Sequence, residues 1–445
     1  MHVDESLDFP GMISCLFERY NVLKLQSQIC YEIGWTMSDD ALRRRLKRLG
    51  RKSRRRQEPQ IASTQRIGLP SGDEIRTPHG LAFRIQELYP RSHQHAGYAL
   101  SKILEFDSDL AARVVRQPEL ASVSFEDMLF LDTETTGLAG GAGTIAFLVG
   151  AGRFCGDHFR LRQYFLREPG EEAGLLHALQ EDLENAGAIV SFNGRVFDVP
   201  LLEMRYMLGL RKYWSLGSLP QIDLLHPSRR LWRRSLPDCS LGTIERHLLG
   251  VQRSDEDVPG ALIPGMYLDY LRTGDAREMT RVLYHNAIDI LSLVGLAVHV
   301  FERHTNQDPG AISGAEALAL ARWHQDAGRE GQAGASFQAA LTSDKVNIKV
   351  EALRHYSAML KRAGKRLEAV EYWETWHSLA ADDPRPCIEL AKYHEWYAHD
   401  FTAAQHWAQE ALQCVTHWPD DWRRDQEWSE IEHRLKRLAR KKLGE

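Results

Sequence analysis

The clearest pattern of hydrophobic and polar positions lies in the middle of the chain. Residues 128–131 form a short apolar run typical of a buried strand, and 144–154 and 158–166 have the same strand character. Further along, the pattern predicts helices over 171–185, 199–208, 241–249 and 276–301, and strands over 188–192 and 221–225. Three meandering strands followed by alternating helices and strands predict a mixed α/β sheet flanked by helices over residues 125–305.

The pattern changes after Pro309, where only helical periods remain. Small and aromatic residues recur there in three groups: Gly328, Ala333, Phe337 and Ala340; Gly364, Ala369 and Trp373; Ala404, Ala408 and Ala411. Steps of 36 and 35 residues separate Ala333, Ala369 and Ala404. This spacing resembles tetratricopeptide repeats, in which small residues let paired helices approach. We therefore expect an all-α repeat domain over 310–420, with an ordinary helical bundle as the alternative.

Three further segments complete the predicted organisation. Residues 1–66 form an N-terminal extension and a basic arm that we expect to be disordered, and 67–124 form a turn-rich lead-in segment. Residues 421–445 end the chain as a basic helix. Residues 1–36 differ in character from the basic segment after them, so one hypothesis takes Met37 as the true start of the protein.

Composition and charge restrict the function. Of 445 residues, 43% are hydrophobic and 26% charged, as expected of a globular protein with more than one domain. The net charge is −5, yet residues 37–66 hold eleven Lys/Arg against three acids, a local balance of +8. A basic block beside an acidic body indicates a polyanionic partner, so Arg43, Arg44 and Arg45 are candidate nucleic-acid contacts.

Cysteine spacing and hydropathy exclude other classes. The six cysteines are scattered without a C-x-x-C pair, which argues against a zinc ribbon and a disulfide framework and favours a cytoplasmic location. No continuous apolar run approaches the ~20 residues that cross a bilayer. The first residues also lack the pattern of a signal peptide. We therefore expect no membrane partner.

A pair of acids follows the first apolar run. Asp132 and Glu134 lie two residues apart on the predicted strand, so their side chains share one face. Burying two like charges is unfavourable unless a cation compensates them, and Mg²⁺ or Mn²⁺ prefers such oxygen ligands. A solvated strand end is the alternative. The glycine run 137–143 lacks Gly-Lys-Ser/Thr and precedes a strand, so it does not indicate a phosphate loop.

Two later motifs carry further acids. Asn193 ends a predicted strand and Asp198 precedes a predicted helix, where a simple helix cap is the alternative. His285 and Asp289 stand four residues apart on a predicted helix and therefore share one face. A pair of solvated surface residues is the alternative for them.

Together, three stretches carry a family resemblance: D-T-E-T-T-G-L-A-G-G-A-G-T, S-F-N-G-R-V-F-D-V-P and H-N-A-I-D-I-L-S-L. In this order they resemble the DEDD exonucleases, the DnaQ-like branch of the RNase H-like fold, and most closely the YprB-type group, which often carries helical repeats. The resemblance covers about residues 125–303. It implies an RNase H-like sheet and 3′→5′ hydrolysis of phosphodiester bonds in single-stranded nucleic acid.

The resemblance also implies the roles of individual residues. Asp132, Glu134, Asp198 and Asp289 would hold two Mg²⁺ or Mn²⁺ ions for a two-metal mechanism. In the family the general base is a His five residues before the last Asp or a Tyr four residues before it. Here the two are exchanged, with Tyr284 at five and His285 at four. We favour His285 as base because it shares the face of Asp289 and because histidine ordinarily titrates near neutral pH.

A basic and aromatic stretch is the last candidate. It comprises Arg229, Arg230, Trp232, Arg233 and Arg234. Arginine binds phosphate and tryptophan stacks on unpaired bases, whereas a solvated loop is the alternative.

The sequence leaves the substrate and part of the function open. Asn193 is a further candidate for nucleic-acid binding, and the repeats are candidates for binding a protein partner. Two rival functions stay open. One is a nucleic-acid-binding adaptor with a weak or silent nuclease core, and the other is an endonuclease that uses the same acids. Whether the substrate is DNA or RNA is not indicated, because discrimination depends on contacts to the 2′-hydroxyl.

Overall fold

The computed structural model describes residues 68–137, 143–254, 257–305 and 312–443. The basic segment with Arg43, Arg44 and Arg45 lies outside the described residues, as does most of the glycine run. The chain divides into two units, residues 1–64 and 65–445, and everything described belongs to the second.

A seven-stranded mixed sheet forms the centre of the region before the helical repeats, in the order β1-β2-β7-β6-β5-β8-β9. The strands are β1 Asp73–Thr77, β2 Gly80–Pro90, β5 Met128–Thr135, β6 Ala146–Cys155, β7 His158–Phe165, β8 Ala188–Ser191 and β9 Gln221–Asp223. A separate short pair consists of β3 Gln94–His95 and β4 Tyr98–Ala99. Neighbours from β1 to β5 are antiparallel, whereas β8 is parallel to both β5 and β9. This arrangement confirms the predicted mixed sheet.

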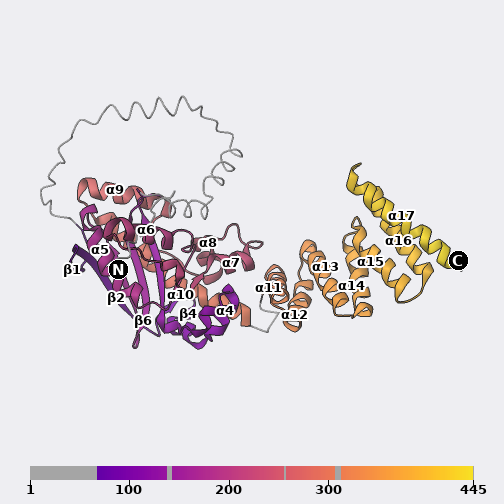
Figure 1. Ribbon diagram of the computed structural model, residues 1–445, viewed down its shortest axis with the longest axis horizontal. Helices are drawn as coiled ribbons and strands as arrows, with labels where there is room; N and C mark the ends of the chain where they lie inside the picture. The colour runs from indigo at the N-terminus through magenta and orange to yellow at the C-terminus, as the bar shows by residue number, and fades with distance from the viewer. Residues whose placement is uncertain (1–67, 138–142, 255–256, 306–311, 444–445) are drawn as a thin grey trace, which may run out of the picture. The chain divides into compact units, whose positions relative to one another are not determined.

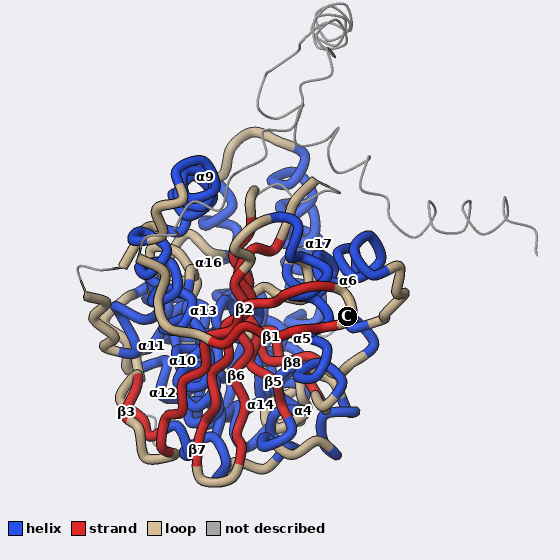
Figure 2. Tube along the Cα trace, turned by 90° about the vertical axis from the view of Figure 1, so that its left-hand side faces the viewer, coloured by secondary structure: helices blue, strands red, loops and turns tan. Residues whose placement is uncertain are grey.

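Helices cover both faces of this sheet (Figures 1 and 2). They are α4 Ser108–Val115, α5 Glu172–Glu184, α6 Asp198–Leu210, α7 Leu225–Trp232, α8 Leu241–Ile244, α9 Ile263–Thr273 and α10 Arg277–Thr305. Side chains of β5 alternate between two cores: Phe130 packs with α4, α7 and the later turns of α10, whereas Leu129 and Leu131 pack with α5, α6 and α9. The period of two along β5 therefore assigns Asp132 and Glu134 to the face of Phe130.

Helix α10 lies close to strand β6 because that strand carries glycines at the contact. A Cβ added to Gly150 would lie 2.4 Å from Oδ1 of Asn286, and one added to Gly152 would lie 2.6 Å from Cγ2 of Ile290. Among the described residues, α10 is also the helix long and apolar enough to cross a membrane by length and composition. In its most apolar window 72% is buried inside the protein, as in a core helix.

The segment 67–124, predicted as a separate lead-in, contributes directly to the sheet. Strand β2 pairs with β7 from Phe83–Phe165 to Pro90–His158, and β1 pairs with β2. Leu110 of α4 packs in the same core as Phe130. The sheet domain of the structure therefore begins at β1, and the predicted boundary at residue 125 falls inside it.

After α10 the described chain forms antiparallel helices that pack on their neighbours in sequence. They are α11 Gly314–Asp326, α12 Glu330–Leu341, α13 Val346–Arg362, α14 Arg366–Leu379, α15 Pro384–Trp396, α16 Phe401–Thr416 and α17 Trp422–Leu443. The recurring small residues Ala333, Ala369 and Ala404 are all fully buried. This helical region supports the predicted repeat domain.

A left-handed residue at the turn between paired helices gives the region a second period. Gly328 and Gly364 have φ of +72° and +80°, and His399 has φ of +53°. These positions are separated by 36 and 35 residues, the same steps as the buried alanines. The turn and the helix contact therefore repeat together.

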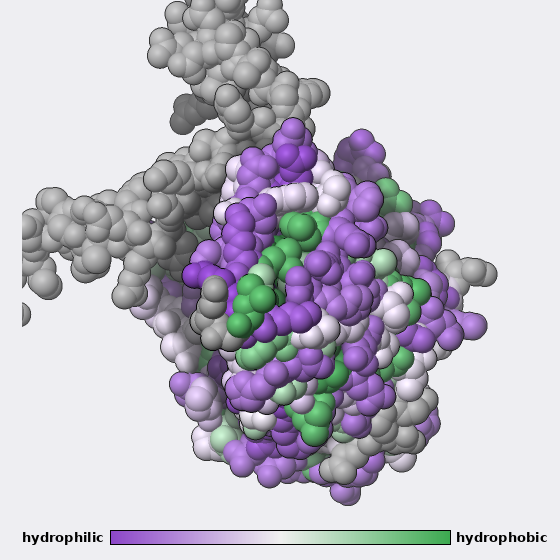
Figure 3. All heavy atoms as spheres, turned by 90° about the vertical axis from the view of Figure 1, so that its right-hand side faces the viewer, coloured by the Kyte–Doolittle hydropathy of each residue, from purple (hydrophilic) through white to green (hydrophobic). Residues whose placement is uncertain are grey.

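The final helix is part of this stack. Arg434, Arg437 and Lys441 of α17 contact the fully buried carboxylate of Glu395 at 2.8, 2.7 and 3.0 Å. Burial works against the charge of Glu395, but the hydrogen bonds from Arg437 and Lys441 lower its pKa to about 2. Figure 3 shows a mostly hydrophilic surface at the end of the molecule where α17 lies, as expected of a terminal repeat. Part of the positive charge of the predicted basic helix is thus paired with a carboxylate inside the protein.

Replacing Gly364 by alanine is expected to lower the free energy of unfolding by about 1 kcal/mol, because alanine resists positive φ. An added Cβ meets no atom within 4 Å at Gly364, so the expected loss comes from the backbone alone. Gly331 is in the first turn of α12 with equally open space, so Gly331→Ala is the matched control and should raise stability by up to about 0.5 kcal/mol. Urea unfolding followed by circular dichroism measures both variants, and effects of equal sign would contradict the prediction.

Candidate active site

Acidic side chains gather where the apolar part of β5 ends. Met128 to Leu131 are buried, and Asp132 and Glu134 continue the strand on the face that α10 covers. Helix α10 places Asp289 on the same face, and the Asn286 amide donates to Oδ2 of Asp132 at 2.8 Å. Two elements more than 140 residues apart in sequence therefore supply three of the four predicted acids.

The fourth acid, Asp198, opens helix α6 after a sharp turn. Asn193 has φ of +66° at that turn, and Gly194 follows it. A Cβ added to Gly194 would lie 2.5 Å from Oγ of Ser191 and 2.9 Å from Oδ2 of Asp198, so the turn requires glycine there. The hydroxyl of Thr133, between the two acids of β5, donates to Oδ1 of Asp198. The turn thus brings Asp198 against the strand.

The sequence analysis missed a fifth acid, Asp223, at the end of β9. Its Oδ1 accepts hydrogen bonds from the backbone N–H groups of Asn193 at 2.8 Å and Leu225 at 3.1 Å. Its charge also contributes to the raised pKa of Asp198. Asp223 therefore ties the turn of Asn193 to the start of α7. An acidic residue inside the short stretch predicted as a strand, 221–225, was the signal that could have identified it.

The electrostatics of the acids are those of a site that needs cations. Burial, and after it repulsion from Asp289 and Asp198, raises the pKa of Asp132 well above its ordinary value. Burial and the charge of Asp132 do the same for Glu134. Burial raises the pKa of Asp198 to about 6, although the hydrogen bond from Thr133 opposes it. Bringing these ionised carboxylates together therefore lowers the free energy of unfolding when no cation is bound.

One arginine offsets part of this charge. Arg253 donates to Asp289 Oδ1 and forms a bidentate pair with Glu245, with N–O distances of 2.6 and 2.8 Å. Glu245 is almost fully buried in a single π-helical turn, Glu245–Leu249. Within the described residues, Arg253 is the arginine or lysine that forms an ion pair with any of the four predicted acids, and its partner among them is Asp289. No motif pointed to it, because it lies in an irregular loop.

The His285 ring lies among these groups. Its Nε2 is 3.5 Å from Asp289 Oδ2 and 3.9 Å from Glu134 Oε1, whereas its Nδ1 is 2.7 Å from Asp257 Oδ1. Arg253 Nη1 also approaches Nδ1 at 3.0 Å. We assign the proton on Nδ1 to the shorter contact with Asp257, so that Nε2 presents its lone pair toward the acids.

Tyr284 faces elsewhere. Its hydroxyl accepts a hydrogen bond from the backbone N–H of Ser254 at 3.3 Å. The exchange of Tyr and His therefore leaves the histidine with the acids and the tyrosine with the loop that carries Arg253. A cavity of about 620 Å³ adjoins the site, lined by Arg253, Asp257, His285 and Asp289 among others.

The donor set fits divalent cations. Ligand atoms of Glu134, His285 and Asp289 all lie within 4.8 Å of one another, and Asp132 and Asp198 border this group through their charges. Three of the four acids carry pKa values raised by burial and mutual repulsion, which a bound cation would relieve. Hard oxygen ligands of this kind suit Mg²⁺ or Mn²⁺.

A second group of potential metal ligands lies between the repeat helices. Cys387 Sγ is 3.2 Å from His377 Nδ1, and Cys414 donates to the backbone oxygen of Ala381 at 2.9 Å. Burial raises the pKa of the Cys387 thiol to about 12, which favours the protonated thiol over the thiolate that metals bind. Both cysteines are buried among the repeat helices.

The predicted arginine and tryptophan stretch is not a loop but the helix α7 and its end. Trp232 is fully buried, and its indole N–H donates to Glu316 of α11 at 3.0 Å. The prediction that Trp232 stacks on a base is therefore wrong, because the repeats cover it. Arg230 pairs with Asp326 and Arg234 with Glu351, both across the junction with the repeats.

The fold and the site together define an RNase H-like nuclease-type domain. A family model described as the RNase H superfamily matches residues 129–301, which include Asp132, Asp198 and Asp289. Such domains are typical of enzymes that hydrolyse nucleic acid with divalent metal ions.

A relative extends the likeness into the repeats. The chain is 31% identical over 363 residues to "Uncharacterized protein YprB" of Bacillus subtilis (strain 168), over 79% of this chain and 84% of that protein. The chain therefore belongs to the YprB family of RNase H-like proteins.

Proposed function

We propose that this protein is a divalent-metal-dependent 3′→5′ exonuclease that hydrolyses phosphodiester bonds of single-stranded nucleic acid. The observation that carries the proposal is the gathering of Asp132, Glu134, Asp198 and Asp289, with more negative charge than Arg253 offsets. A cavity adjoins this group at Asp289. Two bound Mg²⁺ or Mn²⁺ ions would supply charge neutralisation at the phosphate and a more acidic attacking water.

The chain's own residues position these acids. Asn286 is fully buried and holds Asp132 while its Oδ1 accepts from Gln163 Nε2 at 2.9 Å. Thr133 orients Asp198 in the same way. Such outer hydrogen bonds fix the direction in which a ligand oxygen points.

His285 is proposed as the general base. With its Nδ1 proton held by Asp257, its Nε2 is oriented to accept a proton from water beside Glu134 and Asp289. The contact of the Tyr284 hydroxyl with the backbone N–H of Ser254 supports His285 over Tyr284 in this role.

Replacing Asp257 by asparagine is expected to lower kcat about 10–100-fold, because the histidine then loses the carboxylate that fixes its tautomer. KM should change little, since Asp257 acts on His285. Steady-state kinetics over a pH series measures both constants. Asp269→Asn on α9 is the matched control at an exposed acid, and equal kcat for the two variants would contradict the assigned role.

Metal binding is expected to strengthen as pH rises. Asp198 has a folded pKa of about 6 against an ordinary value of 3.8, so without metal its contribution to stability is lost as pH rises from about 4 to about 6. A bound cation needs the ionised carboxylate and removes this loss. The rise in Tm caused by millimolar Mn²⁺ should therefore be larger at about pH 7.5 than at about pH 5. Asp198→Asn should reduce this difference, and a rise in Tm that is independent of pH would contradict the prediction.

The test of the proposed function is cleavage of single-stranded DNA and RNA labelled at the 5′ end. We expect a ladder of shortening products with Mn²⁺ or Mg²⁺ and none with EDTA. Short internal fragments without a ladder would indicate an endonuclease. Binding without cleavage under either metal would indicate the adaptor function, with the repeats recruiting a protein.

Two further proposals concern the surroundings of the enzyme. We propose a cytoplasmic location, which the four described cysteines support because none of them forms a disulfide. We also propose that the helical repeats bind a protein partner, as stacked helix pairs offer extended binding surfaces.

A further inference from the structure

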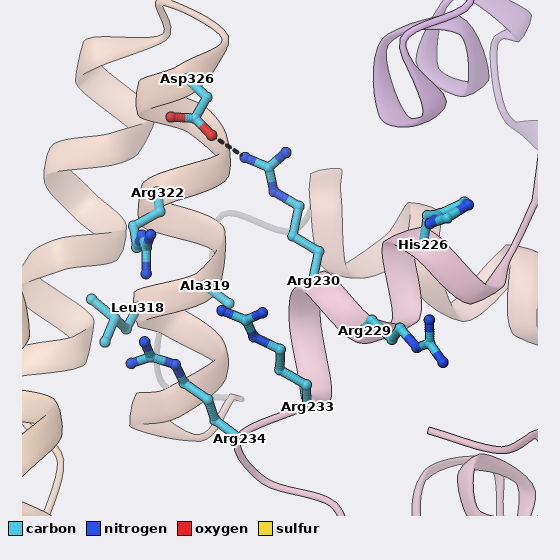
Figure 4. A pocket seen from close by; sticks show the side chains of 9 residues that line it. All are labelled: His226, Arg229, Arg230, Arg233, Arg234, Leu318, Ala319, Arg322 and Asp326. Atoms are coloured by element: carbon cyan, nitrogen blue, oxygen red, sulfur yellow. Dashed lines mark hydrogen bonds and ion pairs between the residues drawn. The ribbon is translucent and has the colours of Figure 1, made fainter. Parts of the chain in front are cut away.

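A cavity lined by arginines lies where helix α7 of the catalytic domain meets α11 of the repeats (Figure 4). Its volume is about 340 Å³, room for roughly ten water molecules. Five arginines line it, together with one histidine and one carboxylate: Arg229, Arg230, Arg233, Arg234, Arg322, His226 and Asp326. Figure 4 shows Arg233 and Arg234 reaching from α7 toward α11, and Arg230 turned toward Asp326. We call this cavity the arginine cleft.

The acids near the arginine cleft do not balance its charge. Asp326 is shared by Arg230 and Arg116, the latter at 3.6 Å. Glu351 is likewise shared, by Arg234 and Arg322.

Two of the arginines have no such partner. Arg229 and Arg233 are exposed, and neither forms an ion pair within the described part of the chain. Two carboxylates therefore face six arginines in and around the cleft. Burial, together with the charges of Arg116 and Arg322, lowers the pKa of Arg230. This concentration of like charge favours an anionic ligand.

The junction between the two domains does not need the unpaired arginines. Trp232 and Trp323 are buried there, and Glu316 accepts hydrogen bonds from Trp232 and pairs with Arg303 at 3.2 Å. Arg229 and Arg233 take no part in these contacts. The guanidinium groups of Arg229 and Arg233 are therefore available to bind a ligand.

The arginine cleft is also close to the acidic site along the sequence. Asp223 borders the acidic site and accepts from the first backbone N–H of α7, and α7 is about 12 Å long. Arg229 lies in the last turn of this helix and Arg233 directly follows the helix. Figure 4 shows the Arg229 side chain pointing away from α11 and the Arg233 side chain pointing toward it. A strand whose 3′ end reaches the acids would meet these two guanidinium groups, one on each side of the end of α7, after a few nucleotides.

We propose that the arginine cleft binds the sugar–phosphate backbone of the single-stranded substrate, away from the bond that is cleaved. A guanidinium group can donate two parallel hydrogen bonds to one phosphate, and this contact does not depend on which base the nucleotide carries. An acidic protein is a poorer match, because protein interfaces are anchored by aromatic side chains and both tryptophans at the junction are buried. The choice of nucleic acid rests on the proposed function, whereas the anionic character of the ligand does not.

The test measures binding in EDTA, where no cleavage occurs. Anisotropy of a 5′-labelled single-stranded oligonucleotide is followed at several salt concentrations with the full chain. We expect the double variant Arg229→Ala/Arg233→Ala to bind about tenfold more weakly. The slope of log K against log salt should fall by about 1.4, or about 0.7 for each lost phosphate contact. The matched control, Arg362→Ala/Arg440→Ala, removes two exposed arginines of α13 and α17 and should bind like the wild type.

Three results would overturn the proposal. They are an unchanged slope in the double variant, an equal loss in the control, and displacement of the oligonucleotide from the wild type by poly-glutamate at equal charge. A nuclease assay that fails while the double variant still loses binding would contradict the proposed function and leave the cleft in place. Thermal unfolding of both variants checks that they are folded.

Discussion

Replacing Asp132 by asparagine is expected to reduce metal-dependent cleavage more than about 1,000-fold. The substitution keeps the shape of the side chain and removes one of the charges that would hold a cation. Asn286 lies 2.8 Å from Asp132 Oδ2, and an amide at position 132 still offers an oxygen to it. The fold should therefore survive.

The same substitution is expected to raise stability when metal is absent. Burial and repulsion from Asp289 and Asp198 raise the pKa of Asp132, so the neutral amide relieves an unfavourable charge. An inactive protein with a higher Tm in EDTA separates a ligand residue from a merely structural one. Asp269→Asn serves as control, since this acid is exposed on α9. Full activity of Asp132→Asn would contradict the role assigned to it.

Replacing Arg253 by methionine should lower the free energy of unfolding by about 3–5 kcal/mol. The variant leaves Glu245 buried without its bidentate partner and removes the cation beside Asp289. Millimolar Mn²⁺ should restore part of the lost stability, because a cation bound by the acids would replace the positive charge of Arg253 beside Asp289.

A double variant makes this test sharper. In Arg253→Met/Glu245→Leu no buried charge is left unpaired at position 245, so most of the stability should return. Urea unfolding of the wild type, both single variants and the double variant completes the cycle. A loss of less than about 1 kcal/mol in Arg253→Met would show that the pair is not needed.

The sequence alone predicted the parts of the site that lie within one element or one turn. Asp132 and Glu134 end an apolar strand, Asp198 follows a turn with Asn193, and His285 shares a helical face with Asp289. Each signal depends on neighbours within about five residues. The three expected meandering strands were found for the same reason, and the one or two long helices expected over 276–301 form the single helix α10.

The partners of these residues could not be predicted, because they come from distant parts of the chain. Arg253 reaches Asp289 from an irregular loop, and Glu245 pairs with Arg253 from a π-helical turn. Gln163 reaches Asn286 from a strand more than a hundred residues away. No short pattern marks such contacts. Asn286 stands beside His285 in the third motif, yet the sequence assigned it no role.

Helix α7 was missed although its pattern was present. Leu225, Ser228, Leu231 and Trp232 are buried at helical spacing, and Pro227 falls in the first turn, where proline is tolerated. The four arginines favoured an exposed segment that contacts nucleic acid or solvent, so the apolar face of the helix was not predicted. Whether Trp232 faces a base or a neighbouring helix depended on α11, which lies more than eighty residues later.

The central claim is tested most directly by giving the enzyme, with Mn²⁺, the same single strand in a linear and a covalently circular form. An exonuclease that starts at a 3′ end must shorten the linear strand, labelled at its 5′ end, stepwise while the circle stays intact. We predict that result. Cleavage of the circle, or early release of the 5′ label as a mononucleotide from the linear strand, would contradict it.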